Sequence, residues 1–383
     1  MASSPDSRLP ALRDYQATLR DTILSALESA PATPILLYLP TGGGKTRIAV
    51  AVCETVLRRD ARALFVVNRS KLVPQVAATC DAFGLAGRYA FIKAGLPADS
   101  TAPMQIASIQ TLYARRESPV SELDALPAAS IVFVDEAHGA VAASYAWLLR
   151  HYKKAGALIV GLSATPKRLR ADEPLSRVFP RLLQGPSVPE LIRRGVLVPT
   201  RTYFAKKDVE PTTSGAAGRA RSASLPDAAA YGHFGDADAS ASIAEVVQLW
   251  RRTCSSETAT PLTHRPTLVF ATDVAHAIQF VRAFEAAGLT AACLSGDTPS
   301  AERETLCDSL ATGSLAVLCS VNVLSEGFDV PAVSAVILAR PTRSAGLYVQ
   351  QVRNAHAAAR PRRELPAMPC LPCVSGWPGS AAV

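Results

Sequence analysis

The stretch at residues 35–46 reads "ILLYLPTGGGKT" and joins an apolar run to a glycine-rich turn that ends in Lys-Thr. The run is typical of a buried strand, and residues 46–59 after it carry a helical pattern. Three glycines let backbone N–H groups close around phosphates without side-chain clashes. Lys45 supplies a positive charge for the β- and γ-phosphates, and Thr46 a hydroxyl for Mg²⁺. We predict a P-loop here; the alternative is an ordinary glycine turn, since Leu39 replaces the first glycine of the strict pattern.

Similar apolar runs recur along the whole chain and alternate with helical patterns, which indicates parallel α/β sheets. The first half has further runs at 63–68, 105–109, 131–136 and 157–164, and the second half has runs at 267–272, 291–296, 316–321 and 334–339. Residues 205–242 are rich in Gly, Ala and Ser and predict a linker or mobile loop. We therefore predict a first domain at 1–204, a linker at 205–242, a second domain at 243–352 and a disordered tail at 353–383.

The composition agrees with two globular domains. The chain has 383 residues, of which 49% are hydrophobic and 19% charged. Without an apolar run of about 18 residues or a signal-peptide pattern, it is expected to be cytoplasmic and to bind no membrane. Cys370 and Cys373 form a C-x-x-C motif without a second ligand pair, which argues against a zinc site. The net charge of +8 favours a polyanionic partner.

A pair of acids marks the end of another apolar run, in "IVFVDEAH" at residues 131–138. The carboxyl ends of strands in open α/β sheets are where ligands bind. Asp135 is placed to hold Mg²⁺ through its water shell, and Glu136 to orient or activate a water. By itself such a pair would more simply cap a turn, but after a P-loop it indicates the second half of a nucleoside-triphosphate site.

With both motifs present, the chain resembles a superfamily 2 helicase of the DEAD/DEAH-box kind, in the branch of excision-repair helicases and restriction-enzyme motor subunits. The resemblance spans about residues 10–352 and rests on eight segments in the family's order. These are "LRDYQ" (12–16), "LPTGGGKT" (39–46), "VVNRSKLVPQ" (66–75), "SIQTLY" (108–113), "DEAH" (135–138), "GLSATP" (161–166), "VFATDVAHA" (269–277) and "VLSEGFDVP" (323–331). The resemblance implies two tandem RecA-like P-loop domains, α/β with parallel sheets, with the second domain incomplete.

The resemblance also implies a role for individual residues. ATP would be bound by Arg13, Gln16 (the adenine contact), Thr41, Gly42, Gly43, Gly44, Lys45, Thr46, Gly327 and Asp329. Lys45, Asp135 and Glu136 would be catalytic, with Thr46 and Asp135 as the Mg²⁺ ligands. His138, Ser163 and Thr165 would couple nucleotide state to domain movement, and Arg69, Gln110 and Thr111 would contact nucleic acid. Simpler roles stay open: a solvated Arg69, a packed His138, and Ser163 and Thr165 as turn caps.

The family's last motif departs from its pattern in this chain. That motif has Gln, two residues, Gly-Arg, two residues and Arg, and its arginines stabilise charge on the transferring phosphoryl group. With Gln350 as the first residue, Arg353, Asn354 and Ala357 stand where Gly, Arg and Arg are expected. A one-residue deletion, recruitment of Arg360, and a reading-frame change after Val352 are the three explanations, and the Ala/Arg/Pro-rich composition of the tail favours the third.

The expected function is an ATP- and Mg²⁺-dependent helicase or translocase acting on DNA. The alternative is a non-catalytic protein that binds ATP or nucleic acid and has lost the arginine fingers. A motor subunit of a nuclease complex is a third possibility, although the sequence shows no nuclease-like cluster of acids and lysine.

Overall fold

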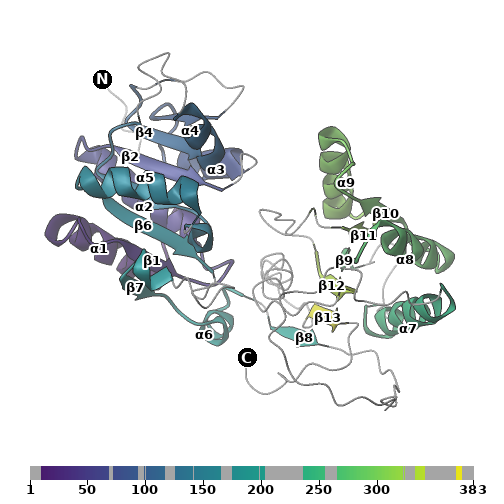
Figure 1. Cartoon of the computed structure of the whole chain (residues 1–383). Helices are drawn as coiled ribbons and strands as arrows, with labels where there is room; N and C mark the ends of the chain where they lie inside the picture. Colours follow the sequence, from purple (N-terminus) through teal and green to yellow (C-terminus); the bar gives the residue numbers. More distant parts are fainter. Residues whose placement is uncertain are drawn as a thin grey trace, which may run out of the picture. The chain divides into compact units, whose positions relative to one another are not determined.

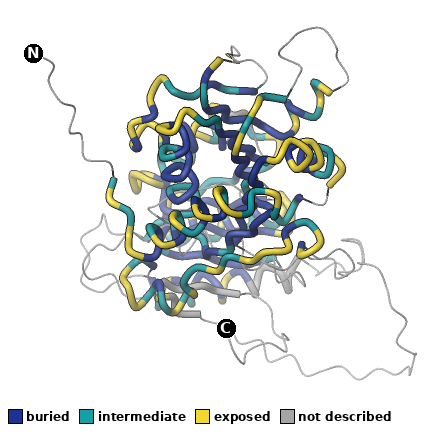
Figure 2. Tube along the Cα trace, turned by 90° about the vertical axis from the view of Figure 1, so that its left-hand side faces the viewer, coloured by how far each residue is buried: buried dark blue, intermediate teal, exposed yellow. Residues whose placement is uncertain are grey.

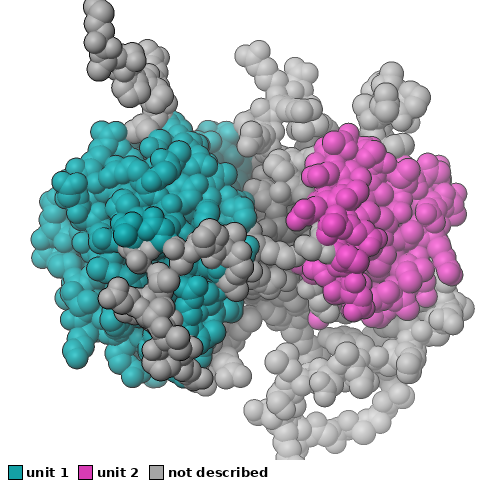
Figure 3. All heavy atoms as spheres, turned by 90° about the horizontal axis from the view of Figure 1, so that it is seen from above, with its two compact units in different colours: residues 1–197, 344–346 teal, residues 198–343, 347–383 magenta. Residues whose placement is uncertain are grey.

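The chain forms two compact units, divided between Leu197 and Val198, which Figure 3 shows in different colours. The computed structural model describes residues 10–68, 72–93, 99, 101–116, 126–140, 142–164, 175–197, 199–202, 236–254, 265–321, 323, 333–340 and 368–372. Each unit has its own parallel sheet with helices on both faces (Figure 1). The prediction of two α/β domains with parallel sheets is confirmed.

The first unit is built on a seven-stranded sheet in the order β3-β4-β2-β5-β6-β1-β7. Every neighbouring pair in it is parallel. The strands are β1 (Ile35–Tyr38), β2 (Ala63–Val67), β3 (Tyr89–Ile92), β4 (Met104–Ser108), β5 (Ile131–Val134), β6 (Leu158–Ser163) and β7 (Arg181–Gln184). Because all strands run the same way, all their carboxyl ends lie at one edge of the sheet.

Helices cover both faces of this sheet because successive strand residues point to opposite sides. One core combines Ile35, Leu37 and Phe65 with the helices α1 (Asp14–Ser29), α2 (Lys45–Arg58), α3 (Val73–Ala82) and α6 (Val188–Arg193). The other core combines Leu36 and Val66 with α4 (Ile109–Arg115), α5 (Ala143–Lys154) and the short helices η3 (Ala137–Gly139) and η4 (Leu175–Arg177). Figure 2 shows the buried residues of these layers in dark blue.

The second unit has a six-stranded sheet in the order β10-β11-β9-β12-β13-β8, also parallel throughout. Its strands are β8 (Thr200–Thr202), β9 (Thr267–Phe270), β10 (Ala291–Leu294), β11 (Val317–Ser320), β12 (Ala335–Leu338) and β13 (Met368–Pro372). Helices α7 (Asp236–Cys254) and α8 (Val274–Ala286) pack on one face, and α9 (Ser300–Thr312) contributes Leu310 to the core on the other. The indole N–H of Trp250 donates to Thr267 Oγ1 at 2.8 Å and ties α7 to β9 inside the core.

Three elements lie outside the boundaries predicted from sequence. β8 pairs with β13 in the second sheet, although the first domain was expected to run to residue 204. α7 begins at Asp236, inside the expected linker, because its Ala-rich first turns favour helix despite their Gly/Ser-rich surroundings. β13 lies in the tail that was expected to be disordered, and it is hydrogen-bonded to β12 and β8 even though it contains two prolines. The other residues of the predicted linker and tail lie outside the described ranges.

Within the described ranges, no helix is long and apolar enough to cross a membrane.

Candidate nucleotide site

The predicted motif segments of the first unit gather at the carboxyl edge of its sheet. The glycine loop follows β1, Ser163 ends β6, and Asp135 and Glu136 follow β5. Because β6 lies between β1 and β5, these three segments are neighbours along the edge. The segments expected to contact nucleic acid follow β2 and β4, farther along the same edge. One half of this edge therefore carries the nucleotide motifs, and the other half carries the predicted nucleic-acid motifs.

The glycine loop is held by its neighbours and then opens into α2. Tyr38 is in register with Ser163, and the Leu39 N–H donates to the Ser163 carbonyl at 3.1 Å. The loop turns with a hydrogen bond of 3.0 Å from the Gly43 N–H to the Pro40 carbonyl. Gly44, at φ +90°, has the left-handed backbone that suits glycine, and α2 begins at Lys45. A loop of N–H groups before a helix N-terminus is a favourable site for phosphate.

The loop has no room for a side chain at its third glycine. A Cβ on Gly44 would lie 2.3 Å from Gln16 Nε2, and the left-handed backbone would add strain. We expect Gly44→Ala to lower the free energy of unfolding by about 1–2 kcal/mol through the backbone alone. We also expect it to weaken ATP binding by about tenfold, equivalent to 1.4 kcal/mol, because Gln16 must move. Thermal melts and ATP titrations measure the two effects.

Gly87→Ala is the matched control for that substitution. Gly87 has a similar φ of +74°, but a Cβ there would meet nothing within 4 Å. Both variants therefore carry the backbone cost, and only Gly44→Ala carries the clash. Equal ATP affinity in the two variants would show that the contact between Gln16 and the loop has no bearing on nucleotide binding.

The side chains of the loop fit a bound polyphosphate. Lys45 Nζ donates to the Leu39 carbonyl at 3.0 Å, so the ammonium group lies over the loop. Thr41 Oγ1 is buried and has no hydrogen-bond partner among the described residues, although a buried hydroxyl normally has one. Gly43 packs directly on Leu39 of the same loop, since a Cβ there would lie 2.7 Å from Leu39 Cγ. Thr46 stands in the first turn of α2, beside Lys45. Hydroxyl and backbone donors beside a cation are what a phosphate chain with its Mg²⁺ requires.

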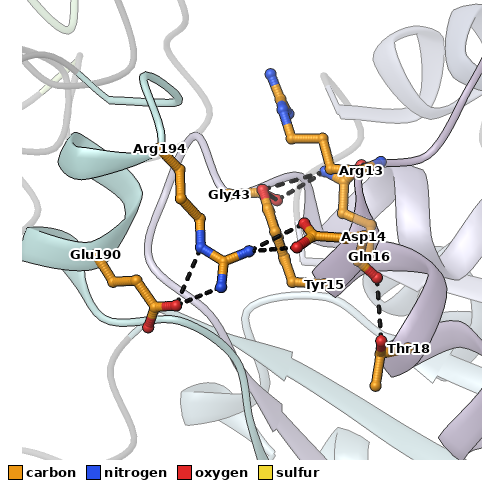
Figure 4. A network of polar contacts seen from close by, with 8 residues as sticks. All are labelled: Arg13, Asp14, Tyr15, Gln16, Thr18, Gly43, Glu190 and Arg194. Carbon is orange, nitrogen blue, oxygen red and sulfur yellow. Dashed lines mark hydrogen bonds and ion pairs between the residues drawn. The ribbon is translucent and has the colours of Figure 1, made fainter.

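The segment predicted to contact adenine braces the glycine loop from α1. Gln16 is fully buried; its Oε1 accepts from the Arg13 N–H at 3.0 Å, and its Nε2 donates to the Gly43 carbonyl at 2.9 Å. The Tyr15 hydroxyl donates to the same carbonyl at 2.8 Å (Figure 4). Both ends of the Gln16 amide are thus engaged by the protein. The contact of Gln16 with adenine stays a prediction, and the structure adds a bracing role for Gln16 and Tyr15.

The acidic segment after β5 is tightly constrained. Glu136 is 8% exposed and has a left-handed backbone at φ 49°, which is uncommon for a residue with a side chain. Its N–H donates to Asp135 Oδ1 at 3.0 Å, and its Oε2 lies 3.3 Å from His138 Nδ1. Gly161 of β6 makes room for this turn, since a Cβ there would lie 2.8 Å from the Ala137 side chain. The segment is therefore packed directly on the strand that ends in Ser163.

The predicted nucleic-acid segments after β2 and β4 are linked to each other. Gln110 Nε2 donates to the Asn68 carbonyl, and Ser108 Oγ donates to Gln110 Oε1 at 2.6 Å. Gln110 is exposed and Thr111 half-buried, both in the first turn of α4. Arg69 lies outside the described residues. The structure thus brings Gln110 next to the residue that precedes Arg69, which the sequence alone did not indicate.

The remaining predicted residues belong to segments that the structure describes only in part. Thr165, Gly327 and Asp329, and the segment from Gln350 to Ala357, lie outside the described ranges. In the second unit, Asp273 caps α8 by accepting from the His276 N–H at 2.9 Å. That hydrogen bond is the main reason why the pKa of Asp273 is lowered. This explains the Thr-Asp pair in "VFATDVAHA" as a helix start.

Comparison with protein-family models assigns both halves of the chain. Residues 9–168 match the model for the type III restriction enzyme res subunit, and residues 252–358 match the model for the helicase conserved C-terminal domain. A candidate ATP-dependent helicase of Saccharomyces cerevisiae, IRC3, is 25% identical over 356 residues, which are 90% of this chain and 49% of that protein. This chain spans 49–61% of the length of the curated relatives that it matches.

Solved structures share the fold. The type ISP restriction-modification enzyme LlaBIII bound to DNA aligns with a TM-score of 0.66 at 16% identity, over 96% of this chain and 28% of that one. Dbp5 of S. cerevisiae bound to RNA and ADP BeF3 aligns with a TM-score of 0.61 at 16% identity, over 96% of this chain and 88% of that one. At this identity the likeness establishes the architecture of the chain and not its substrate.

Proposed function

We propose that this chain, which belongs to the superfamily 2 helicases and resembles restriction-enzyme motors within them, is an ATP-dependent DNA translocase or helicase. The observation that carries the proposal is the arrangement of the glycine loop, Ser163 and the Asp135–Glu136 pair on three neighbouring strand ends. A P-loop and an acidic strand end at the same edge of one sheet are the two halves of a nucleotide hydrolysis site.

The residues of the first unit divide the chemistry among themselves. The loop N–H groups and Lys45 would bind the phosphates, with Thr46 and Asp135 holding Mg²⁺. Mg²⁺ bound there would neutralise charge that develops on the phosphate oxygens. Glu136, held in place by its constrained backbone, would orient the attacking water and accept its proton.

The nucleic acid is proposed to lie along the other half of the same sheet edge. Gln110 and Thr111 are at the start of α4, next to the residue that precedes Arg69. The chain's net charge of +8 supports a polyanionic partner. We propose DNA, the nucleic acid bound by LlaBIII; RNA, bound by Dbp5, is the alternative that the assay below separates. We also propose a cytoplasmic location, from the sequence.

A non-catalytic binding protein is the second candidate, and one specific observation favours it. Arg353, Asn354 and Ala357 stand where the family has Gly, Arg and Arg. A chain without finger arginines would still bind ATP through the glycine loop but would lack their stabilisation of the transition state.

ATP hydrolysis with and without single-stranded DNA separates the two candidates. We expect DNA to raise the hydrolysis rate and RNA of the same sequence to raise it less. Gln110→Ala should weaken DNA binding about fivefold, for the loss of one hydrogen bond of about 1 kcal/mol. Gln248→Ala, at an exposed position of α7 in the second unit, is the control. A rate that no nucleic acid changes would rule out the motor and leave the binding protein.

A further inference from the structure

Arg194 connects the end of α6 to the start of α1, 180 positions earlier in the chain. Its Nη1 donates to both carboxylate oxygens of Asp14, at 2.9 and 2.7 Å, and its Nε donates to Glu190 Oε1 at 3.0 Å. The hydrogen bonds to Glu190 and to Asp14 raise the pKa of Arg194. One guanidinium thus satisfies two carboxylates in the planar fork that only arginine provides.

The contacts continue from Arg194 to the glycine loop. The guanidinium lies over the ring of Tyr15, with 5.7 Å between Cζ and the ring centroid. The hydroxyl of that same ring donates to the Gly43 carbonyl at 2.8 Å. Gln16, the next residue of α1, donates to it as well. Figure 4 shows this path from Glu190 through Arg194 and Tyr15 to Gly43. Two successive contacts therefore separate Arg194 from the loop that is proposed to bind phosphates.

We infer that Arg194 is a positioning residue for the nucleotide site, which holds Tyr15, and through it the glycine loop, in the conformation that accepts ATP. The inference rests on the proposed function only in its claim that the loop accepts ATP. A purely structural ion pair is the simpler account. Exposed ion pairs contribute little to global stability, so the two accounts differ in where the loss of Arg194 is felt. If Arg194 positions the loop, its loss should increase local opening of the glycine loop. If the ion pair is only structural, its loss should slightly lower the free energy of unfolding and leave the loop unchanged.

Arg194→Met and Arg193→Met form a matched pair of variants. Arg193 is exposed, lies next to Arg194 in sequence, and makes no side-chain hydrogen bond or ion pair with the described residues. Both variants lose one positive charge, so only the contacts differ. Arg194→Lys keeps the charge and loses the fork, and we expect it to behave like Arg194→Met.

Hydrogen exchange of the peptide covering residues 39–46 tests the inference without nucleotide. We expect exchange about three- to fivefold faster in Arg194→Met than in wild type, as loss of one ion pair permits more local opening. Arg193→Met should exchange like wild type. Calorimetric titration of the same proteins with Mg-ATP should show a matching three- to fivefold loss of affinity for Arg194→Met alone.

The hydrogen-exchange measurement and the ATP titration together distinguish failure of the inference from failure of the proposed function. Equal loop exchange in Arg194→Met and Arg193→Met would overturn the inference, even with ATP bound normally by every protein. If the wild-type chain bound no ATP, the proposed function would fail, and the exchange arm would still decide whether Arg194 positions the loop. Wild-type behaviour of Arg194→Lys would overturn the role of the planar fork.

Discussion

Lys45→Ala is expected to remove detectable ATP binding by this chain. Lys45 is the cation of the glycine loop, and its Nζ lies 3.0 Å from the Leu39 carbonyl within that loop. Hydrogen bonds between charged groups contribute about 1.5–3 kcal/mol each, and a lysine that bridges two phosphates makes two of them. We therefore expect ATP affinity to fall by about 10²- to 10⁴-fold. Equilibrium titration with Mg-ATP measures the change.

Lys153→Ala is the control for that variant. Lys153 is exposed in the last turn of α5, which precedes β6 and so lies at the opposite edge of the sheet. It removes the same charge from the same unit without approaching the loop. Unchanged ATP affinity in Lys45→Ala, in a protein that melts like wild type, would refute the assignment of the P-loop.

Most central strands of the two sheets could be predicted from sequence, whereas three of the four edge strands could not. The five runs predicted in the first half correspond to β1, β2, β4, β5 and β6, whose residues are almost all buried. The two strands that were missed, β3 and β7, are the edges of the seven-stranded sheet. An edge strand is covered on fewer sides, so it needs no continuous apolar run: β7 (Arg181–Gln184) is mostly exposed. In the second sheet the edge strand β8 and the inner strand β13 were missed, whereas the edge strand β10 was predicted.

The candidate site was predictable where its function depends on local sequence and not where it depends on distant contacts. The glycine loop and the Asp135–Glu136 pair are contiguous motifs, so their placement at strand ends followed from the runs before them. The bracing of Gly43 by Tyr15 joins residues 28 positions apart, and the contact of Arg194 with Asp14 joins residues 180 apart. No periodicity carries such information. The sequence segment "LRDYQ" does contain Tyr15 beside Gln16, which was the one available sign of a paired role.

Restoring the expected last motif should convert this chain into a much faster ATPase. The triple variant Arg353→Gly, Asn354→Arg, Ala357→Arg recreates Gly-Arg-x-x-Arg at the proper distance from Gln350. Finger arginines stabilise the charge of the transferring phosphoryl group and contribute about 10³–10⁵ in rate in related nucleotide hydrolases. We expect DNA-stimulated turnover to rise toward that range, with ATP affinity nearly unchanged, because the glycine loop is the proposed binding site of the phosphates. Steady-state hydrolysis at saturating DNA measures the gain.

The spacing of the two arginines, and not their charge, must produce this gain. Arg353→Gly with Ala355→Arg and Ala358→Arg adds the same number of charges to the same segment with both arginines shifted by one position. An arginine finger acts through hydrogen bonds aimed at one phosphoryl group, so a displaced side chain loses most of the effect. The shifted variant should therefore hydrolyse ATP like the chain as written. Equal acceleration in both variants would mean that the added positive charge, and not the spacing of the arginines, raises turnover. Acceleration in neither variant would mean that two arginines at these positions are not enough to restore turnover. Fast turnover by the unaltered chain would refute the loss of the fingers.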